Sequence, residues 1–265
     1  MKELNNKVAW ITGASSGIGE ALAYQLAGMG CSLVISSNQE EELGKVQEEI
    51  VKKGGKCIAL PFDLADAVGI PLIAKEAISA FGRIDLLFNN GGISQRSLIN
   101  ETPVDNDRRI MEINYFSNIV LTKSVLPQMI RNGGGHIAVT SSLSGLFGFP
   151  LRSAYCASKH ALHGFYETLR IEHIHDNIKV TIACPDRVRT RISFNALDSR
   201  GKAHGRMDER QDKGITADEC ASAIIKAVRK DKIIVLIGGF EKVAVYLKRY
   251  LPSVFYRMIA KVKAT

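Results

Sequence analysis

Short apolar runs alternate with longer helical patterns along this chain, and no other feature limits its possible folds as strongly. Continuous apolar runs rich in β-branched residues are typical of strands covered on both faces. Seven such runs are present: Val8–Thr12, Ser32–Ser36, Cys57–Leu60, Ile84–Phe88, His136–Thr140, Lys179–Ala183 and Ile233–Ile237. Helical patterns occupy residues 17–29, 39–53, 66–80, 104–131, 154–175 and 217–230. Repeated strand–helix–strand units predict an α/β fold with about seven parallel strands and helices on both faces.

The chain is expected to form one domain. A length of 265 residues suits a single α/β domain. No internal repeat, low-complexity tract or linker divides it. We therefore predict a single Rossmann-like, doubly wound domain over residues 1–265. Ligands in such folds bind beyond the carboxyl ends of the strands, so functional residues should lie there.

A glycine-rich turn follows the first predicted strand and precedes the first predicted helix. Glycines allow a tight turn and a close approach of the backbone to a pyrophosphate, and a helix N-terminus favours anions. The residues expected to hold a dinucleotide here are Gly13, Ser15, Ser16, Gly17, Ile18 and Gly19. Their GxxxGxG spacing differs from the common GxGxxG fingerprint, so a plain glycine-rich turn is the alternative.

Two further strand ends carry residues suited to the same cofactor. Asp63 and Leu64 follow the third strand, where a carboxylate would accept a hydrogen bond from an adenine amine or cap the next helix. Asn90 and Gly91 follow the fourth strand. They suit a backbone that passes close to a ribose or nicotinamide, and an ordinary Asn-Gly turn is the alternative.

A tyrosine and a lysine share one face of the helical pattern 154–175. Tyr155 and Lys159 are four residues apart, so the phenol and the ammonium project together. A surface pair is the alternative for such a spacing taken alone. Ser142 follows the fifth strand and would border the same crevice, where its hydroxyl can hold a carbonyl oxygen against the phenol.

Together these motifs resemble those of the short-chain dehydrogenase/reductases of the ordinary, roughly 250-residue class. The resemblance extends from residue 5 to about residue 238. Thr12–Gly19 matches TGxxxGIG, Asn89–Gly92 matches NNAG with Gly91 in place of alanine, and Tyr155 and Lys159 match YxxxK. The stretches 89–97 and 155–162 more closely resemble the member-7 branch of dehydrogenase/reductases.

The resemblance implies an NAD(P)-dependent oxidoreductase that interconverts a carbonyl and a secondary alcohol. Tyr155 is then the general acid and base, and Lys159 lowers its pKa and holds the nicotinamide ribose. Ser142 orients the substrate oxygen, and Asn114 keeps a water that links Lys159 to solvent. The alternative is a cofactor-binding regulatory protein of the same fold with little or no turnover. The substrate is a small molecule that the sequence does not identify, and no metal is expected.

The resemblance also identifies the segment after the sixth strand, where the family has PGxVxT. Pro185, Val188 and Thr190 match it and are expected to hold the nicotinamide carboxamide. Asp186 replaces the glycine. The backbone conformation of the family at this position is therefore not carried over to this chain, because aspartate is less easily accommodated at positive φ.

The end of the second strand distinguishes NAD from NADP in such folds. An acid there binds the ribose hydroxyls of NAD, whereas a base accommodates the extra phosphate of NADP. This chain has neither, and Ser37 and Asn38 stand at the position. Because no acid repels a phosphate there and these side chains can donate to it, NADP is favoured over NAD.

Charge, cysteine content and hydropathy bear on partners and location. The net charge of +8 is read as a solvated basic surface, without a nucleic-acid motif. Five widely spaced cysteines predict buried free thiols, and no apolar run reaches 18 residues, so a cytoplasmic chain is expected.

A homodimer or homotetramer is predicted from surplus apolar residues on two long helical patterns, namely Ile119, Leu126, Met129, Phe165 and Leu169.

Two segments remain beside the motifs. Residues 190–215 correspond, by the resemblance, to a variable substrate loop. In the tail, residues 239–265, bases alternate with aromatic and aliphatic residues. The tail is expected to pack on protein, as a lid or against another subunit, with peripheral contact to an anionic membrane as the less favoured alternative. Deleting residues 240–265 is predicted to raise the KM for the substrate and to leave cofactor affinity almost unchanged.

Overall fold

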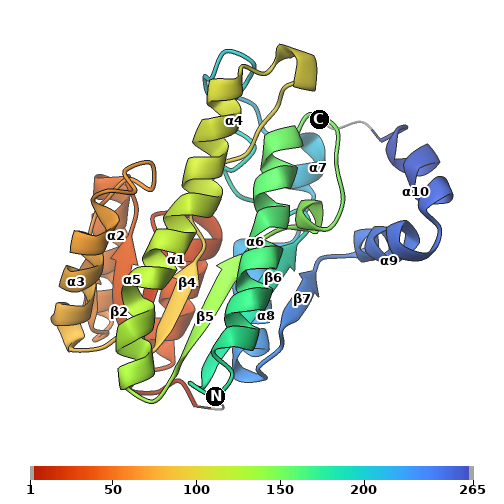
Figure 1. Ribbon diagram of the computed structural model, residues 1–265. Coiled ribbons are helices and arrows are strands. Elements are labelled where there is room, and N and C mark those ends of the chain that lie inside the picture. The colour runs from red at the N-terminus through yellow and green to blue at the C-terminus, as the bar shows by residue number, and fades with distance from the viewer. Residues whose placement is uncertain (1–2, 263–265) are drawn as a thin grey trace.

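Seven strands form one parallel sheet in the order β3-β2-β1-β4-β5-β6-β7 in the computed structural model, which describes residues 3–262 (Figure 1). The strands are β1 Val8–Thr12, β2 Ser32–Ser36, β3 Cys57–Ala59, β4 Leu86–Asn89, β5 Gly135–Thr140, β6 Ile178–Pro185 and β7 Ile234–Ile237. The order reverses between β1 and β4, which is the switch point where such sheets bind ligands. The predicted Rossmann-like, doubly wound fold is confirmed.

Helices cover both faces of the sheet (Figure 1). The principal ones are α1 Gly17–Gly28, α2 Glu40–Lys52, α3 Ile70–Phe81, α4 Val104–Met111, α5 Ser117–Arg131, α6 Ser153–Glu172 and α8 Ala217–Arg229. Buried side chains of α1, α2 and α8 form the core on one face, and those of α3, α5 and α6 form the core on the other. This two-sided burial explains why the strands are almost continuously apolar.

Two predicted helices differ from the structure for local reasons. The pattern 66–80 begins as a helix only at Ile70, because Asp66 accepts the N–H of Gly69 in a preceding turn and a proline occupies the first turn of α3. The pattern 104–131 is not one α-helix. A π-helical turn, Glu112–Phe116, separates α4 from α5. This turn carries Asn114, and π turns of this kind are frequent at functional sites.

The apolar residues counted toward a subunit interface are only partly available for one. Met129 and Leu169 are buried in the core of the chain itself, so the prediction was wrong to count them as surplus. Ile119, Leu126 and Phe165 are half-buried. The homo-oligomer therefore stays a prediction.

The tail forms two short helices beyond the β7 edge of the sheet (Figure 1). These are α9 Val243–Tyr250 and α10 Pro252–Ile259, preceded by a 3-10 turn, Phe240–Lys242. Phe255 is fully buried, with its ring centroid 5.3 Å from that of Phe147, and Lys248 donates to the carbonyl of Leu146 at 2.7 Å. The tail thus packs on its own chain.

The expectation that the apolar surface of the tail avoids water is wrong in part. Phe240 is 83% exposed and Tyr250 is 70% exposed. Residues 263–265 of the tail lie outside the described residues. Within the part of the chain that the structure describes, no helix is both long enough and apolar enough to cross a bilayer.

Candidate active site

A cleft of about 1020 Å³ opens at the carboxyl ends of the central strands. Its size lies at the upper end of the range for small-molecule and cofactor sites. The predicted site residues that line it are Gly13, Ser15, Ser16, Gly17, Ile18, Ser37, Asn38, Asp63, Leu64, Asn90, Gly91, Ser142, Tyr155, Lys159, Pro185, Val188 and Thr190. Two predicted site residues, Gly19 and Asn114, are not among the residues that line it.

The glycine-rich turn brings β1 and α1 close to the segment that follows β6. Gly17 has φ +59°, and a Cβ added to it would lie 2.9 Å from Cγ2 of Thr190. Gly19 packs directly against the carbonyl oxygen of Gly13 on the inner side of the turn. A side chain at Gly17 would therefore force the two segments apart, and one at Gly19 would disrupt the turn itself.

The N-terminus of α1 is suited to an anion. Its N-cap residue, Ser16, has an extended backbone and makes no side-chain capping bond to the helix. Free N–H groups and the positive end of the helix dipole favour a phosphate there. The hydroxyls of Ser15 and Ser37 lie 2.8 Å apart beside this turn. The turn, the helix end and the size of the cleft together fit a dinucleotide.

Asp63 shapes the turn after β3. Its Oδ1 accepts the N–H of Ala65 at 2.9 Å, and the N-cap position of α3 is held by Gly69. Asp63 is therefore not the helix cap considered from the sequence. The adenine contact stays a prediction.

The segment after β4 joins the ends of three strands. The side-chain amide of Asn90 donates to the carbonyl of Thr12 at 3.2 Å and accepts from the hydroxyl of Thr140 at 3.1 Å. Gly91 has little free space, because an added Cβ would lie 2.5 Å from Cδ1 of Leu64. The Leu64 side chain thus occupies the space that the methyl group of an alanine at position 91 would need.

Ser142, Tyr155 and Lys159 all line the cleft. Nζ of Lys159 lies 5.7 Å from the ring centroid of Tyr155 and donates to the carbonyl of Thr140 at 2.7 Å. Burial raises the pKa of the Tyr155 phenol, although a hydrogen bond with Ser142 and the nearby guanidinium of Arg152 act in the opposite direction. The phenol is thus protonated at neutral pH and able to donate a proton.

Lys159 is held in a poorly solvated position. Its residue is 4% exposed, and burial lowers the pKa of its ammonium to about 8. The ammonium is therefore mostly charged at neutral pH and loses its proton in mildly alkaline solution.

The Asn114 side chain bridges two elements that contribute residues to the cleft. Its side-chain amide donates to the carbonyl of Ile93 at 2.9 Å and to the hydroxyl of Ser158 at 3.0 Å, and its Oδ1 accepts the N–H of Ile93 at 2.8 Å. The side chain thus joins the segment after β4 to α6. The water role that the resemblance implies for Asn114 stays a prediction.

The backbone at Asp186, which the sequence left open, does not have a positive φ. Its N–H donates to the carbonyl of Ile237 at 2.8 Å. The left-handed conformation occurs instead at Gly238, φ +138°, whose added Cβ would lie 2.8 Å from Cβ of Asp186. The close approach of the two chain segments after β6 and β7 is thus allowed by Gly238, after β7, and not by a glycine at position 186, after β6.

Sequence reasoning missed one group of cleft residues, the ion cluster of Arg96, Arg152 and Asp208. The cleft also has an apolar wall that includes Phe147 and Leu247; the tail that contains Leu247 was expected to act as a lid, but no residue of the wall was named. Arg96 and Asp208 are 112 positions apart, so no local pattern indicates that they meet. For Leu247, the alternation of apolar and basic residues in the tail was the available signal.

Comparisons with known proteins identify the family of this chain. A family model described as short chain dehydrogenase matches residues 7–200. The chain is 38% identical over 264 residues to a Drosophila melanogaster dehydrogenase/reductase SDR family protein 7-like, covering 98% of this chain and 81% of that relative. It is 40% identical over 258 residues to human dehydrogenase/reductase SDR family member 7, covering 95% of this chain and 76% of the human protein.

Solved structures give the same result. The chain is similar to a short chain dehydrogenase/reductase from Burkholderia phymatum in complex with NAD, with a TM-score of 0.86, 26% identity and 96% of each chain covered. An alcohol dehydrogenase from Thermococcus sibiricus complexed with 5-hydroxy-NADP is also similar, with a TM-score of 0.76 and 25% identity, covering 89% of this chain and 97% of that chain.

Proposed function

Because the chain belongs to the short-chain dehydrogenase/reductase family, we propose that this oxidoreductase interconverts a carbonyl and a secondary alcohol, with Tyr155 as general acid and base. The observation that carries the proposal is the convergence of Tyr155, Ser142 and Lys159 in one cleft with the glycine-rich turn. A nicotinamide cofactor, when bound, supplies or accepts the hydride.

The roles of the side chains follow from their protonation states and positions. In carbonyl reduction the Ser142 hydroxyl donates to the substrate oxygen and orients it, and the neutral phenol of Tyr155 gives that oxygen a proton. The Lys159 ammonium stabilises the phenolate left behind, because a positive charge near the ring favours the charged form. In alcohol oxidation the same phenolate takes the proton back.

The cofactor is held by three parts of the cleft. We assign the pyrophosphate to the glycine-rich turn and the N-terminus of α1, the ribose to Asn90 and Lys159, and the carboxamide to Val188 and Thr190. The cleft lining near β2 includes Ser15, Ser37 and Asn38, whose side chains can donate to a phosphate. This favours NADP over NAD.

The tail completes the substrate side of the site in this proposal. Leu247, Met258 and Ile259 line the cleft together with Phe147. We assign this apolar wall to the substrate, with the tail as a lid that excludes water. The five cysteines are buried free thiols, which suits a reducing compartment, and we propose the cytoplasm.

The experiment is a screen of ketones, quinones, steroids and sugars with NADPH and NADH, followed by the same assay on Tyr155→Phe. The variant should bind cofactor normally and lose turnover. Tyr166→Phe is a matched control on the same helix, because the Tyr166 hydroxyl binds Asn89 and Thr122 in the core. That variant should lose stability and keep turnover. Substantial activity in Tyr155→Phe, or cofactor binding without turnover of any carbonyl by the unmodified protein, would overturn the proposal.

A further inference from the structure

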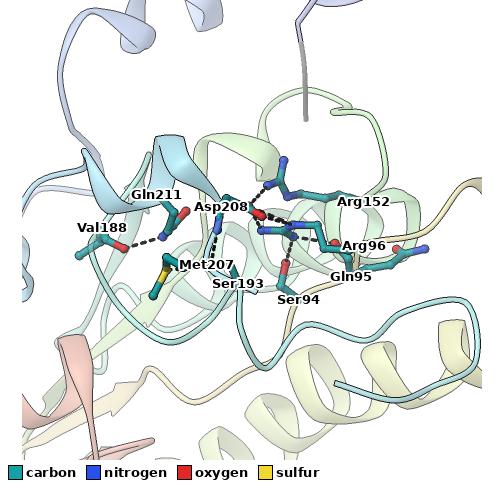
Figure 2. Close-up of polar contacts among 9 residues, drawn as sticks. All are labelled: Ser94, Gln95, Arg96, Arg152, Val188, Ser193, Met207, Asp208 and Gln211. Atoms are coloured by element: carbon teal, nitrogen blue, oxygen red, sulfur yellow. Dashed lines mark hydrogen bonds and ion pairs between the residues drawn. The ribbon is translucent and has the colours of Figure 1, made fainter. Parts of the chain in front are cut away.

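Two arginines hold one carboxylate of the segment 190–215 (Figure 2). Nε of Arg96 lies 3.0 Å from Oδ2 of Asp208, and its Nη2 donates to the same oxygen. Nη2 of Arg152 donates to that oxygen from the other side at 3.1 Å. The side chains of Arg96, Asp208 and Arg152 are only 2%, 4% and 13% exposed. Such a buried ion cluster has little competition from water.

The two arginines come from elements close to the reacting phenol. Arg152 is the N-cap residue of α6, three residues before Tyr155. Arg96 belongs to the segment after β4. Its neighbour Gln95 is fully buried, and Oε1 of Gln95 accepts the N–H of Ala154 at 2.9 Å, in the first turn of α6. The segment after β4 therefore contacts the helix that carries Tyr155.

The same segment is joined to the substrate loop by backbone hydrogen bonds. The N–H of Arg96 donates to the carbonyl of Leu197 at 2.8 Å, and the N–H of Leu197 donates to the carbonyl of Ser94 at 2.9 Å. Within the loop, the N–H of Asp208 donates to the hydroxyl of Ser193 at 3.4 Å. One short segment thus contacts both the loop and the start of the catalytic helix.

We propose that Asp208 is a positioning residue, which by binding Arg96 and Arg152 together clamps the segment 190–215 over the carbonyl pocket and holds the first turn of α6, with Tyr155, in its reactive position. This inference rests on the proposed function for the chemistry of Tyr155. Its geometric basis is that Ile192 and Asn195 of the clamped loop line the cleft. Loss of one partner from a buried ion cluster is strongly unfavourable, so the clamp depends on Asp208.

The clamp also sets the charge around the phenol. The charged or titratable groups around Tyr155 are Arg152, Arg96, Lys159, Cys156 and, through the arginines, Asp208. Both guanidiniums lower the pKa of the Tyr155 phenol. A neutral residue at position 208 would leave their charge less balanced and lower that pKa further. Loss of an arginine would raise it.

The test compares Asp208→Asn with Arg96→Gln in the full-length protein. Both variants should speed hydrogen exchange of the amides of residues 190–212 and of Ala154 and Tyr155, because both open the clamp. Both should raise the KM for the carbonyl about tenfold or more, with unchanged cofactor affinity. The alkaline limb of the reduction pH profile should move to lower pH in Asp208→Asn and to higher pH in Arg96→Gln. A purely structural role would not produce these opposite movements.

Two further variants keep the test decisive. Asp212→Asn changes an exposed carboxylate of the same segment and should alter none of these quantities. Arg96→Lys keeps the charge and loses the two-donor fork, so it should speed exchange without moving the pH limb, even where Asp208→Asn does not fold. Unchanged exchange in these clamp variants, or pH limbs that move together, would overturn the clamp. The clamp can be tested even if the proposed function fails. Hydrogen exchange measures the clamp in a protein that turns over no carbonyl.

Discussion

Lys159→Met should change the stability of the fold in a way that depends on pH. Burial lowers the pKa of the Lys159 ammonium from 10.5 to about 8. Each pKa unit corresponds to about 1.4 kcal/mol, so burying the charged lysine destabilises the folded protein by roughly 3 kcal/mol at neutral pH. Methionine has nearly the same length and removes this penalty. It also removes the hydrogen bond from Lys159 to Thr140, which offsets about 1.5–3 kcal/mol of the gain.

The pH dependence isolates the titration of this one group. Between pH 8 and 10.5 the unfolded chain binds more protons at this lysine than the folded chain does, so the stability of the unmodified protein rises with pH. Near pH 9.5 only about 1.4 kcal/mol of the penalty remains. The stability of Lys159→Met relative to the unmodified protein should therefore fall by roughly 2 kcal/mol between pH 7 and about pH 9.5.

The assay is denaturant unfolding of both proteins at the two pH values without cofactor. Trp10, the single tryptophan of the chain, is fully buried and supplies the fluorescence signal. Lys123→Met serves as the control, because Lys123 is exposed on α5 and should give no pH-dependent difference. A difference between Lys159→Met and the unmodified protein that stays constant with pH would refute the reasoning. Lys159→Met should also weaken cofactor binding and turnover together.

Three further predictions concern the cofactor, the tail and the assembly. Ser37→Asp should shift preference from NADP(H) toward NAD(H) by repelling the additional phosphate, and calorimetric affinities for both cofactors measure the shift; tighter binding of NAD than NADP by the unmodified protein would contradict the NADP assignment. Deleting residues 240–265 should raise the KM for the carbonyl with little change in cofactor affinity, since the tail supplies apolar side chains such as Leu247 and Met258 to the cleft, and unchanged kinetics would eliminate the lid. Light scattering at micromolar concentration should detect a dimer or tetramer, with Phe116 exposed on the π-helical turn before α5 and Ile171 exposed on α6, and only a 29.0 kDa species would refute the assembly.

The sequence alone determined the parallel sheet and most of the cofactor cleft. Both depend on patterns within a few residues. Continuous apolar runs indicate strands buried on both faces, and strand ends must lie at one edge of a parallel sheet. Gly13, Ser37 and Asn90 could therefore be expected to border one cleft before any contact between them was known, and the structure brings them to that cleft. Thr190 was expected there only from the family resemblance.

Only the tertiary structure decided the features that depend on distant parts of the chain. The ion cluster joins Arg96 to Asp208 across 112 positions, and neither residue carries a local signal of the other. The burial of Met129 and Leu169, and the unstrained backbone at Asp186 beside Gly238, likewise depend on neighbours from other elements. Local periodicity reports which face of an element is apolar. It does not report which distant segment covers that face, because the packing of the whole chain decides this.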